Sequence, residues 1–281
     1  MMFIAILIAL VIERFFDWSH LRQWNWFIAF QRVVANKLQS QSPYLILAIS
    51  IVPFVFIVAA INIILQGLLF GFPKLIFQLI ILMASLGAQN LWADTFACIN
   101  ILRQGDARNA AEKLKAAFDI NDMSDPQKLH QQLVQRIFIA SNHRIFAAVF
   151  WFFILGPAGA ILYRLTTLSF ESTTKESVSP DATLAAENVE STLDWVPVRI
   201  LTFLFALGGQ FVQVLNAWRK KMMLGIHANE ELLTDCGFAA LGFEDHAKIS
   251  EDGSVEEAAI SLLDRTFVIA LVFIALIVLV I

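Results

Sequence analysis

The residues best suited to chemistry stand near the start of a long apolar stretch. That stretch runs from Gln135 to Leu168, and Asn142, His143 and Arg144 lie close to its beginning. A long basic side chain at a membrane boundary can extend to the lipid headgroups, which would be an architectural role. Alternatively, Arg144 faces the interior of a helical bundle and holds an anionic ligand or a carboxylate such as Asp94. The sequence leaves both alternatives open.

A second unusual stretch runs from Asp194 to Arg199 and reads Asp-Trp-Val-Pro-Val-Arg. Its two charges flank Pro197, and Arg199 can pair either with Asp194 or with Glu190. Trp195 suits the boundary between lipid and water, where indole rings are enriched. We therefore expect this stretch to be architectural, as an anchor at the outer leaflet.

No pattern of a familiar catalytic or metal centre occurs in the sequence. The phosphate-binding GxxxxGK[ST], the zinc-binding HExxH and the nucleophile pattern GxSxG are all missing. A metal site needs convergent ligands, but the histidines are scattered, as His20, His130, His143, His227 and His246. Cys98 and Cys236 lie far apart, so no disulfide framework is predicted. We expect no catalytic residue, no metal and no cofactor.

The composition is that of a membrane protein. Of the 281 residues, 58% are hydrophobic and 16% are charged, whereas about a quarter of an ordinary soluble domain is charged. The charges fall between long apolar runs, and the first residues lack the basic region and cleavage site of a signal peptide. The predicted fold class is therefore all-α, a polytopic membrane helical bundle.

About six membrane segments are predicted, at residues 2–16, 44–70, 75 onward past Gln89 and Asn90, 135–168, 200–215 and 267–281. In an alternative with four spans, 2–16 and 200–215 lie at the interface. Residues 17–43, with several tryptophans and basic residues, suit an amphipathic interfacial helix. Ser124-Asp125-Pro126 predicts the start of a long helix that enters the membrane.

The distribution of Lys and Arg predicts the orientation. With the N-terminus in the periplasm, sixteen of the 20 Lys and Arg residues fall inside, in agreement with the positive-inside rule. This orientation places two helical segments, 103–135 and 218–264, in the cytosol. It places a loop, 171–193, in the periplasm, and residues 181–193 of it are predicted to form a short helix. We expect a single integral membrane domain over residues 1–281.

Several of these residues form a pattern that resembles the AmpE family. The pattern comprises Asn142, Arg144, Ala147, Phe150-Trp151, Gly156-Pro157-x-Gly159-Ala160, Tyr163-Arg164 and the run from Leu193 to Arg199, with Glu13-Arg14-Phe15-Phe16 near the start. AmpE proteins lie in the inner membrane of Gram-negative bacteria, are encoded beside an anhydro-muropeptide amidase and are associated with β-lactamase induction. The resemblance implies an architectural role for Trp151, Gly156, Pro157, Asp194, Trp195, Pro197 and Arg199.

The pattern is also similar, more distantly, to the CobD/CbiB cobalamin-biosynthesis proteins, which are membrane enzymes that form an amide bond with ATP. Their acidic pattern ahead of the Phe-Trp pair is replaced here by residues 139–145. Their Asn-Thr-Leu-Asp is Thr-Thr-Leu-Ser at 166–169, and their Ser-Pro-Asn-Ala-Gly is replaced by residues 226–231, Ile-His-Ala-Asn-Glu-Glu. Carboxylates are natural ligands for Mg²⁺ in phosphate chemistry, so these losses argue against ligation.

The function that the resemblance implies is a non-catalytic signalling modulator linked to β-lactamase induction and muropeptide recycling. Asn142, His143, Arg144 and Asp94 are the candidate contacts with a muropeptide-type ligand or a regulatory protein, in a chain that also meets the lipid bilayer and binds no nucleic acid. One alternative is an ATP-dependent amide ligase, which would need metal ligands from Asp94, Glu190 and Asp194. Another is a small-solute transporter, which should show internal repeats.

Overall fold

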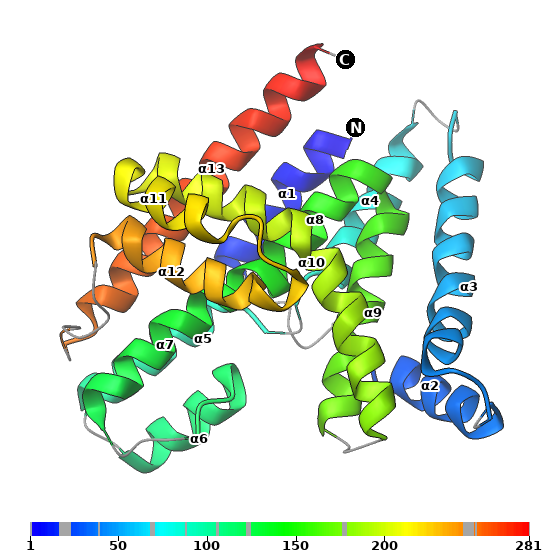
Figure 1. The fold of residues 1–281 in the computed structure, drawn as a ribbon. Helices are drawn as coiled ribbons and strands as arrows, with labels where there is room; N and C mark the ends of the chain where they lie inside the picture. The colour runs from blue at the N-terminus through cyan, green and yellow to red at the C-terminus, as the bar shows by residue number, and fades with distance from the viewer. Residues whose placement is uncertain are drawn as a thin grey trace. The chain divides into compact units, whose positions relative to one another are not determined.

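Every element in the described part of the chain is a helix (Figure 1). The computed structural model describes residues 2–16, 24–38, 40–67, 71–87, 89–104, 107–121, 125–175, 179–243, 250 and 252–280. The helices are α1 (Met2–Phe15), α2 (Asn25–Lys37), α3 (Pro43–Ile64), α4 (Phe72–Ser85), α5 (Leu91–Gln104), α6 (Ala107–Phe118), α7 (Pro126–Ser141), the π turn η3 (Asn142–Phe146), α8 (Ala147–Leu155), α9 (Pro157–Lys175), α10 (Pro180–Gly208), α11 (Phe211–Lys221), the short η4 (Ile226–Ala228), α12 (Asn229–Leu241) and α13 (Ser254–Val280).

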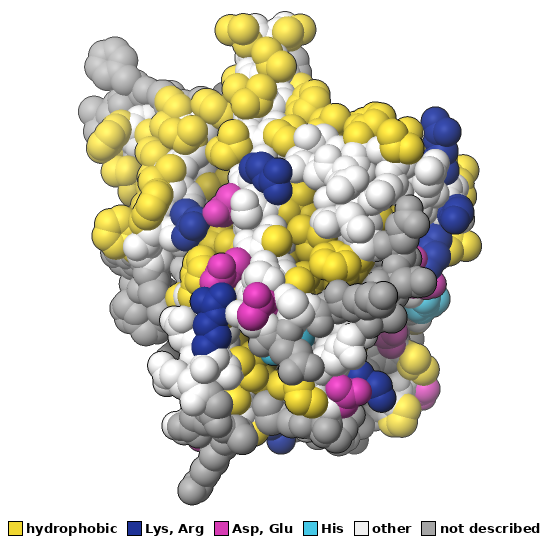
Figure 2. Space-filling view, turned by 90° about the vertical axis from the view of Figure 1, so that its left-hand side faces the viewer, with side chains coloured by type: hydrophobic (Ala, Val, Ile, Leu, Met, Phe, Trp, Pro, Cys, Tyr) yellow, Lys and Arg dark blue, Asp and Glu magenta, His cyan; other side chains and the backbone are white. Residues whose placement is uncertain are grey.

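Four helical stretches among the described residues are long and apolar enough to cross a membrane: Pro43–Ile64, Pro126–Leu155, Pro180–Gly208 and Ser254–Val280. Phe72–Ser85 is a shorter apolar helix. The surface of the spans is apolar: Phe56 on α3 is 70% exposed and Leu279 on α13 is 83% exposed. Figure 2 shows wide areas of hydrophobic side chains, and others where charged side chains gather. The polytopic helical bundle is confirmed, because such surfaces are stable only against lipid.

The described chain divides into two compact units, and the single integral membrane domain over residues 1–281 stays a prediction. Unit 1 consists of Met1–Ala88 and Ile145–Asp194, and unit 2 of Gln89–Arg144 and Trp195–Ile281. In unit 1, α9 packs against α3, α4 and α8 around a core that includes Phe27, Ile161 and Leu165. α2 packs beside α3 (Figure 1), and Phe54, in the middle of α3, contacts three aromatic rings of α2. Of the interfacial segment expected at 17–43, residues 17–23 and 39 lie outside the described residues.

In unit 2, α7 packs against α12 and α13, and α11 packs against α12. Phe138 of α7 lies against Gly237, where an added Cβ would stand 2.4 Å from the phenyl ring. The two segments predicted to be cytosolic, 103–135 and 218–264, pack together, because Arg103 pairs with Glu257 at 2.8 Å. The sequence alone did not decide this point.

The long helix expected to enter the membrane is confirmed. Asp125 is its N-cap and accepts from the backbone N–H of Gln127 at 3.0 Å, while Pro126 is the first helical residue. This arrangement satisfies a free donor and uses proline where no N–H is needed. Ser124, the other residue of the predicted start, lies outside the described residues. The helix continues through the π turn to Leu155.

The prediction of a single helix from Leu75 past Asn90 is wrong, because α4 ends at Ser85 and α5 begins at Leu91. Asn90 causes the new start: its side-chain oxygen accepts from the N–H of Ala93 at 2.9 Å. Such local bonds from Asn to the backbone compete with helix continuation.

Within the range 171–193, the short helix expected at 181–193 is confirmed as part of α10, and residues 171–175, expected in a loop, are helical as well. α9 continues to Lys175, since the hydroxyls of Ser172, Thr173 and Thr174 donate to carbonyls of the preceding turn. α10 begins at Pro180, and Ser179 accepts from the N–H of Ala182 at 3.2 Å. The periplasmic location of this range stays a prediction.

A separate span at 200–215 is also wrong. α10 runs without interruption from Pro180 to Gly208, and the chain breaks at Gly209 and Gln210 before α11. The backbone of Gly209 approaches α12 so closely that an added Cβ would stand 2.6 Å from the carbonyl oxygen of Ala240. Gln210 donates its N–H to the same oxygen at 3.1 Å. The number of full spans in the four-span alternative agrees with the four long apolar helices, but α10 is one of them in place of the segment from 75 onward.

Candidate functional site

Asp94, Lys113 and Arg144 form a charged cluster in unit 2. The Oδ1 atom of Asp94 accepts from Lys113 Nζ at 2.7 Å, and its Oδ2 atom accepts from Arg144 Nη1 at 3.3 Å. Asp94 lies in the first turn of α5, where the helix dipole also favours a negative charge. Of the two alternatives for Arg144, the structure shows the inward one, with a carboxylate as its partner.

Arg144 also fixes the end of α6. Its Nη2 atom donates to the carbonyl of Ala117, and its guanidinium carbon lies 5.2 Å from the centre of the Phe118 ring. The carbonyls of a last helical turn have no partner within the helix, so a cation there is doubly favourable. Arg144 thereby joins α5, α6 and the π turn.

Asn142 and His143 occupy the same π turn as Arg144. Asn142 is fully buried and His143 is half-buried. Single π turns inside helices often accompany functional sites. Of the four candidate contact residues, the structure brings Asp94 and Arg144 into direct contact, and a ligand-binding role for any of them stays a prediction.

The interruption at Gly156 and Pro157 has a steric cause in unit 1. Gly156 has a φ of +68°, which favours glycine, and Pro157 is the first residue of α9. At Gly159 an added Cβ would stand 2.2 Å from the carbonyl oxygen of Trp151. These residues therefore allow α9 to turn back closely against α8.

The side chain of Trp151 forms a hydrogen bond with α10 near the proline of that helix. Pro197 lies inside α10 and has no N–H, so the carbonyl of Leu193, four residues earlier, receives no donor from its own helix. Trp151 Nε1 donates to that carbonyl at 3.1 Å. The Phe-Trp pair and the Leu-Asp-Trp-Val-Pro run are thus linked by one hydrogen bond, which explains how the membrane helix tolerates its proline.

The two charges that flank Pro197 do not pair with each other. Asp194 is buried in unit 1 and accepts from the hydroxyl of Tyr163 at 2.8 Å. The predicted pairing of Arg199 with Asp194 or Glu190 is wrong. All hydrogen bonds of the Arg199 side chain to described residues go to carbonyl oxygens and to one amide.

Arg199 fastens α10 to the chain that follows α11. Its Nε and Nη2 atoms donate to the carbonyls of Met222 and Leu224 at 3.1 and 2.9 Å, and Nη1 donates to the side chain of Asn229. The guanidinium carbon lies 4.5 Å from the centre of the Trp195 ring. A span at 200–215 would have put Arg199 and Met222 on opposite sides of the bilayer, which their direct hydrogen bond excludes.

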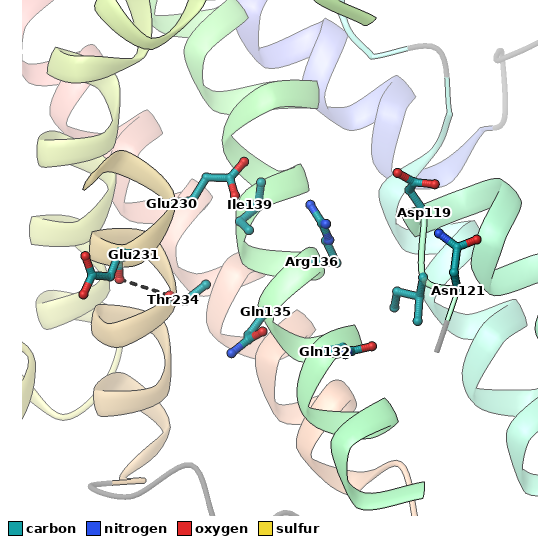
Figure 3. A pocket seen from close by; sticks show the side chains of 10 residues that line it. Asp119, Asn121, Gln132, Gln135, Arg136, Ile139, Glu230, Glu231 and Thr234 are labelled. Atoms are coloured by element: carbon teal, nitrogen blue, oxygen red, sulfur yellow. Dashed lines mark hydrogen bonds between the residues drawn. The ribbon is translucent and has the colours of Figure 1, made fainter. Parts of the chain in front are cut away.

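A polar cleft of about 440 Å³ opens in unit 2 (Figure 3). Asp119, Ile120 and Asn121 line it from the end of α6, Gln132, Gln135, Arg136 and Ile139 from α7, and Glu230, Glu231 and Thr234 from α12. None of these residues is predicted from the sequence to belong to a site. The sequence does contain one indication of this cleft, because Glu230 and Glu231 belong to the stretch 226–231 that departs from the cobalamin pattern.

The match to a family model covers almost the whole chain. Residues 1–280 match the model described as "Regulatory signalling modulator protein AmpE". The chain belongs to the AmpE family. The chain is also 26% identical over 168 residues to the "Cobalamin biosynthesis protein CobD" of Stutzerimonas stutzeri (strain A1501), a match that covers 59% of this chain and 55% of that protein. The protein of that name from Chromobacterium violaceum is 25% identical over 172 residues, covering 60% and 55%. No solved structure matches.

The chain thus spans about half the length of the curated relatives it matches. As an AmpE-family member with four membrane-crossing helices, it is a multi-pass inner-membrane protein. Within the residues of the AmpE pattern, Trp151, Gly159, Arg144 and Arg199 form bonds or close approaches that hold helices together. This pattern therefore describes a helical framework.

Proposed function

We propose that this AmpE-family chain is a non-catalytic modulator that couples muropeptide recycling to β-lactamase induction. The family assignment supports the regulatory part of the proposal. The non-catalytic part is supported chiefly by the Asp94 cluster. The carboxylate of Asp94 is already engaged by two cations, and Arg144 also holds α6, so these groups act as a structural clamp.

The proposed orientation has the N-terminus in the periplasm and the segments 103–135 and 218–264 in the cytosol. The excess of Lys and Arg in those segments supports it. Their mutual packing through α7 and α12 is consistent with a location on the same side. Fusions of alkaline phosphatase and of a fluorescent protein to the N-terminus test the orientation. Phosphatase activity without fluorescence is expected, and the opposite result would refute the proposal.

The functional test uses a bacterium that has an inducible β-lactamase and lacks its own AmpE-family gene. This chain is supplied in trans, and β-lactamase activity is measured after exposure to a β-lactam. We expect the chain to change the induced level, and Asp94→Asn to reduce that change because the clamp on α6 loses its charge. Glu112→Gln, on the exposed face of α6, is the matched control. An induced level that does not depend on the chain, at normal membrane yield, refutes the proposal.

A second candidate function is an ATP-dependent amide ligase. The similarity to the CobD proteins favours it, and so do two buried acids of unit 1, since carboxylate oxygens of Glu190 and Asp194 lie within 4.8 Å of one another. Melting of the purified chain with Mg-ATP and, separately, with anhydro-muropeptide distinguishes the two functions. A ligand raises the melting temperature only if it binds the folded state. Stabilisation by Mg-ATP supports the ligase, whereas stabilisation by muropeptide alone supports the modulator.

A further inference from the structure

The cleft of unit 2 is lined by polar side chains that the fold does not use. Among the described residues, the side chains of Asp119, Arg136 and Glu230 make no hydrogen bond or ion pair. Glu231 differs, because it accepts from Lys221 Nζ at 2.5 Å. Groups that do not stabilise the fold are available to a ligand. Figure 3 shows them on three separate segments around the same opening.

The first wall holds an acidic residue against its local preference. Asp119 follows the last turn of α6 and has a φ of +55°, the left-handed conformation that often ends a helix and that aspartate adopts more readily than most residues. A carboxylate at the C-terminal end of a helix is, however, disfavoured by the helix dipole. Violations of local rules tend to persist at functional sites. The bond from Arg144 to Ala117 keeps this end of α6 in place.

The opposite wall is fixed in the same manner. Asn229, directly before Glu230, is bonded by Arg199, and Lys221 bonds both Glu231 and Asp235 on α12. The two walls are thus held by buried or half-buried groups that do not line the cleft themselves, apart from Glu231. Such support from behind a site lowers the entropy cost of binding.

The charges of the lining specify the ligand. With Glu231 paired to Lys221, two unpaired carboxylates, Asp119 and Glu230, and one guanidinium, Arg136, remain. Asn121, Gln132 and Gln135 add amides, which both donate and accept hydrogen bonds. A ligand that complements these charges and amides carries ammonium groups, one carboxylate and peptide-like polar groups between them. A volume of about 440 Å³ fits the usual range for small molecules, about 300–1,000 Å³.

We propose that this cleft binds a short zwitterionic peptide with free ammonium groups and a free carboxylate. Arg136 binds the carboxylate through two parallel N–H donors, the geometry in which guanidinium groups recognise carboxylates. Glu230 and Asp119 bind the ammonium groups, and the amides bind the peptide bonds. This inference rests on the proposed function only for the role of the peptide as a signal. Binding of the peptide to the cleft is measured independently of that role.

The test is calorimetric titration of the full-length chain in detergent with the dipeptide Ala-Lys. This probe has two ammonium groups and one carboxylate, which match Glu230, Asp119 and Arg136. We expect a Kd below about 1 mM, and a loss of at least about tenfold for the dipeptide amide, which has no carboxylate. Arg136→Gln should weaken Ala-Lys by the same factor and should no longer distinguish Ala-Lys from its amide.

Two further variants separate the cleft from general electrostatics. Glu230→Gln should weaken Ala-Lys more than it weakens N-acetyl-Ala-Lys, which has one ammonium fewer. Arg219→Gln and Glu112→Gln change the same charges at exposed positions outside the cleft and should leave the affinity unchanged. Absence of binding up to about 10 mM, equal affinity for the amide, or an equal effect of the control variants would overturn the proposal. If β-lactamase induction still depends on the chain in that case, the proposed function stands and only the ligand assignment fails.

Discussion

The hydrogen bond from Trp151 to the carbonyl of Leu193 can be tested by a double-mutant cycle. Trp151→Phe keeps an aromatic ring but removes the indole N–H, which lies 3.1 Å from that carbonyl. The carbonyl then has neither the indole donor nor a helical one, because Pro197 has no N–H. Leaving a buried acceptor unsatisfied costs about 1–3 kcal/mol. Pro197→Ala restores a helical donor to the same carbonyl.

The expected coupling follows from these two changes. In the natural chain, Trp151→Phe should lower the apparent melting temperature by about 2–12 °C, at about 2–4 °C per kcal/mol for a domain of this size. In the Pro197→Ala chain the same substitution should lower it by clearly less, because the backbone N–H of the introduced alanine then supplies the donor. The loss of ring packing is common to both backgrounds and cancels in the cycle.

The measurement is the loss of helical circular dichroism on heating in detergent, at one scan rate for all four chains, since membrane proteins often unfold irreversibly. Trp151→Tyr is a useful control, because it keeps an aromatic ring with a hydrogen-bond donor but places that hydroxyl away from the position of the indole N–H. Equal decreases in the two backgrounds would refute the idea that Trp151 compensates for Pro197.

Three further predictions concern unit 2. Gly237→Ala should lower the melting temperature by several degrees, since the added methyl group would stand 2.4 Å from the ring of Phe138 and overpacking costs about 1–3 kcal/mol. Burial raises the pKa of the Cys98 thiol to about 11 and that of the Cys236 thiol to about 12, so at pH 8 neither should react with a maleimide until the protein is denatured. Burial lowers the pKa of Lys221, but its hydrogen bonds and ion pairs with two carboxylates of α12 outweigh that effect and raise it overall. Because the folded-state pKa is the higher one, this stabilisation is present below about pH 10.5 and is lost above it. The melting difference between the natural chain and Lys221→Met should therefore shrink as the pH rises past that value.

The long apolar helices could be predicted from the sequence, because their signal is additive over many residues. α3 and α13 each contain an apolar run with few charges, and the start of α7 has a local cap in Asp125 and Pro126. These features depend on neighbours in the chain. The membrane class and the approximate positions of α3, α13 and the helix that begins at Pro126 follow from them alone.

The breaks between helices depended on more than hydropathy. Gly209 marks the end of α10 because its backbone meets Ala240 of α12, and nothing near Gly209 in the sequence specifies that partner. Asn90, in contrast, begins α5 through a local cap on Ala93, so that signal was in the sequence but was outweighed by the surrounding apolar residues.

The partners of Arg144 and Arg199 also differ in how far they could be predicted from the sequence. Asp94 could be suggested as a partner of Arg144 because buried cations require anions and few carboxylates are available. Arg199 instead uses the carbonyls of Met222 and Leu224. Every residue has a carbonyl, so a search for complementary side chains cannot find such a partner. The error about the 200–215 span followed from this limit.

The relation between framework and cleft explains how one helical pattern can accompany different chemistry. Arg144 and Arg199 belong to the pattern by which the chain resembles its family, and each fixes one wall of the cleft without lining it. Glu230 and Glu231 lie instead in the stretch 226–231, which departs from the cobalamin pattern. A fold positions a site, but the residues of the site determine what it binds. Substitution of Arg199 should therefore weaken both stability and Ala-Lys binding, whereas Glu230→Gln should weaken binding at an unchanged melting temperature. A large loss of stability in Glu230→Gln would show that this carboxylate belongs to the framework and would remove it from the proposed site.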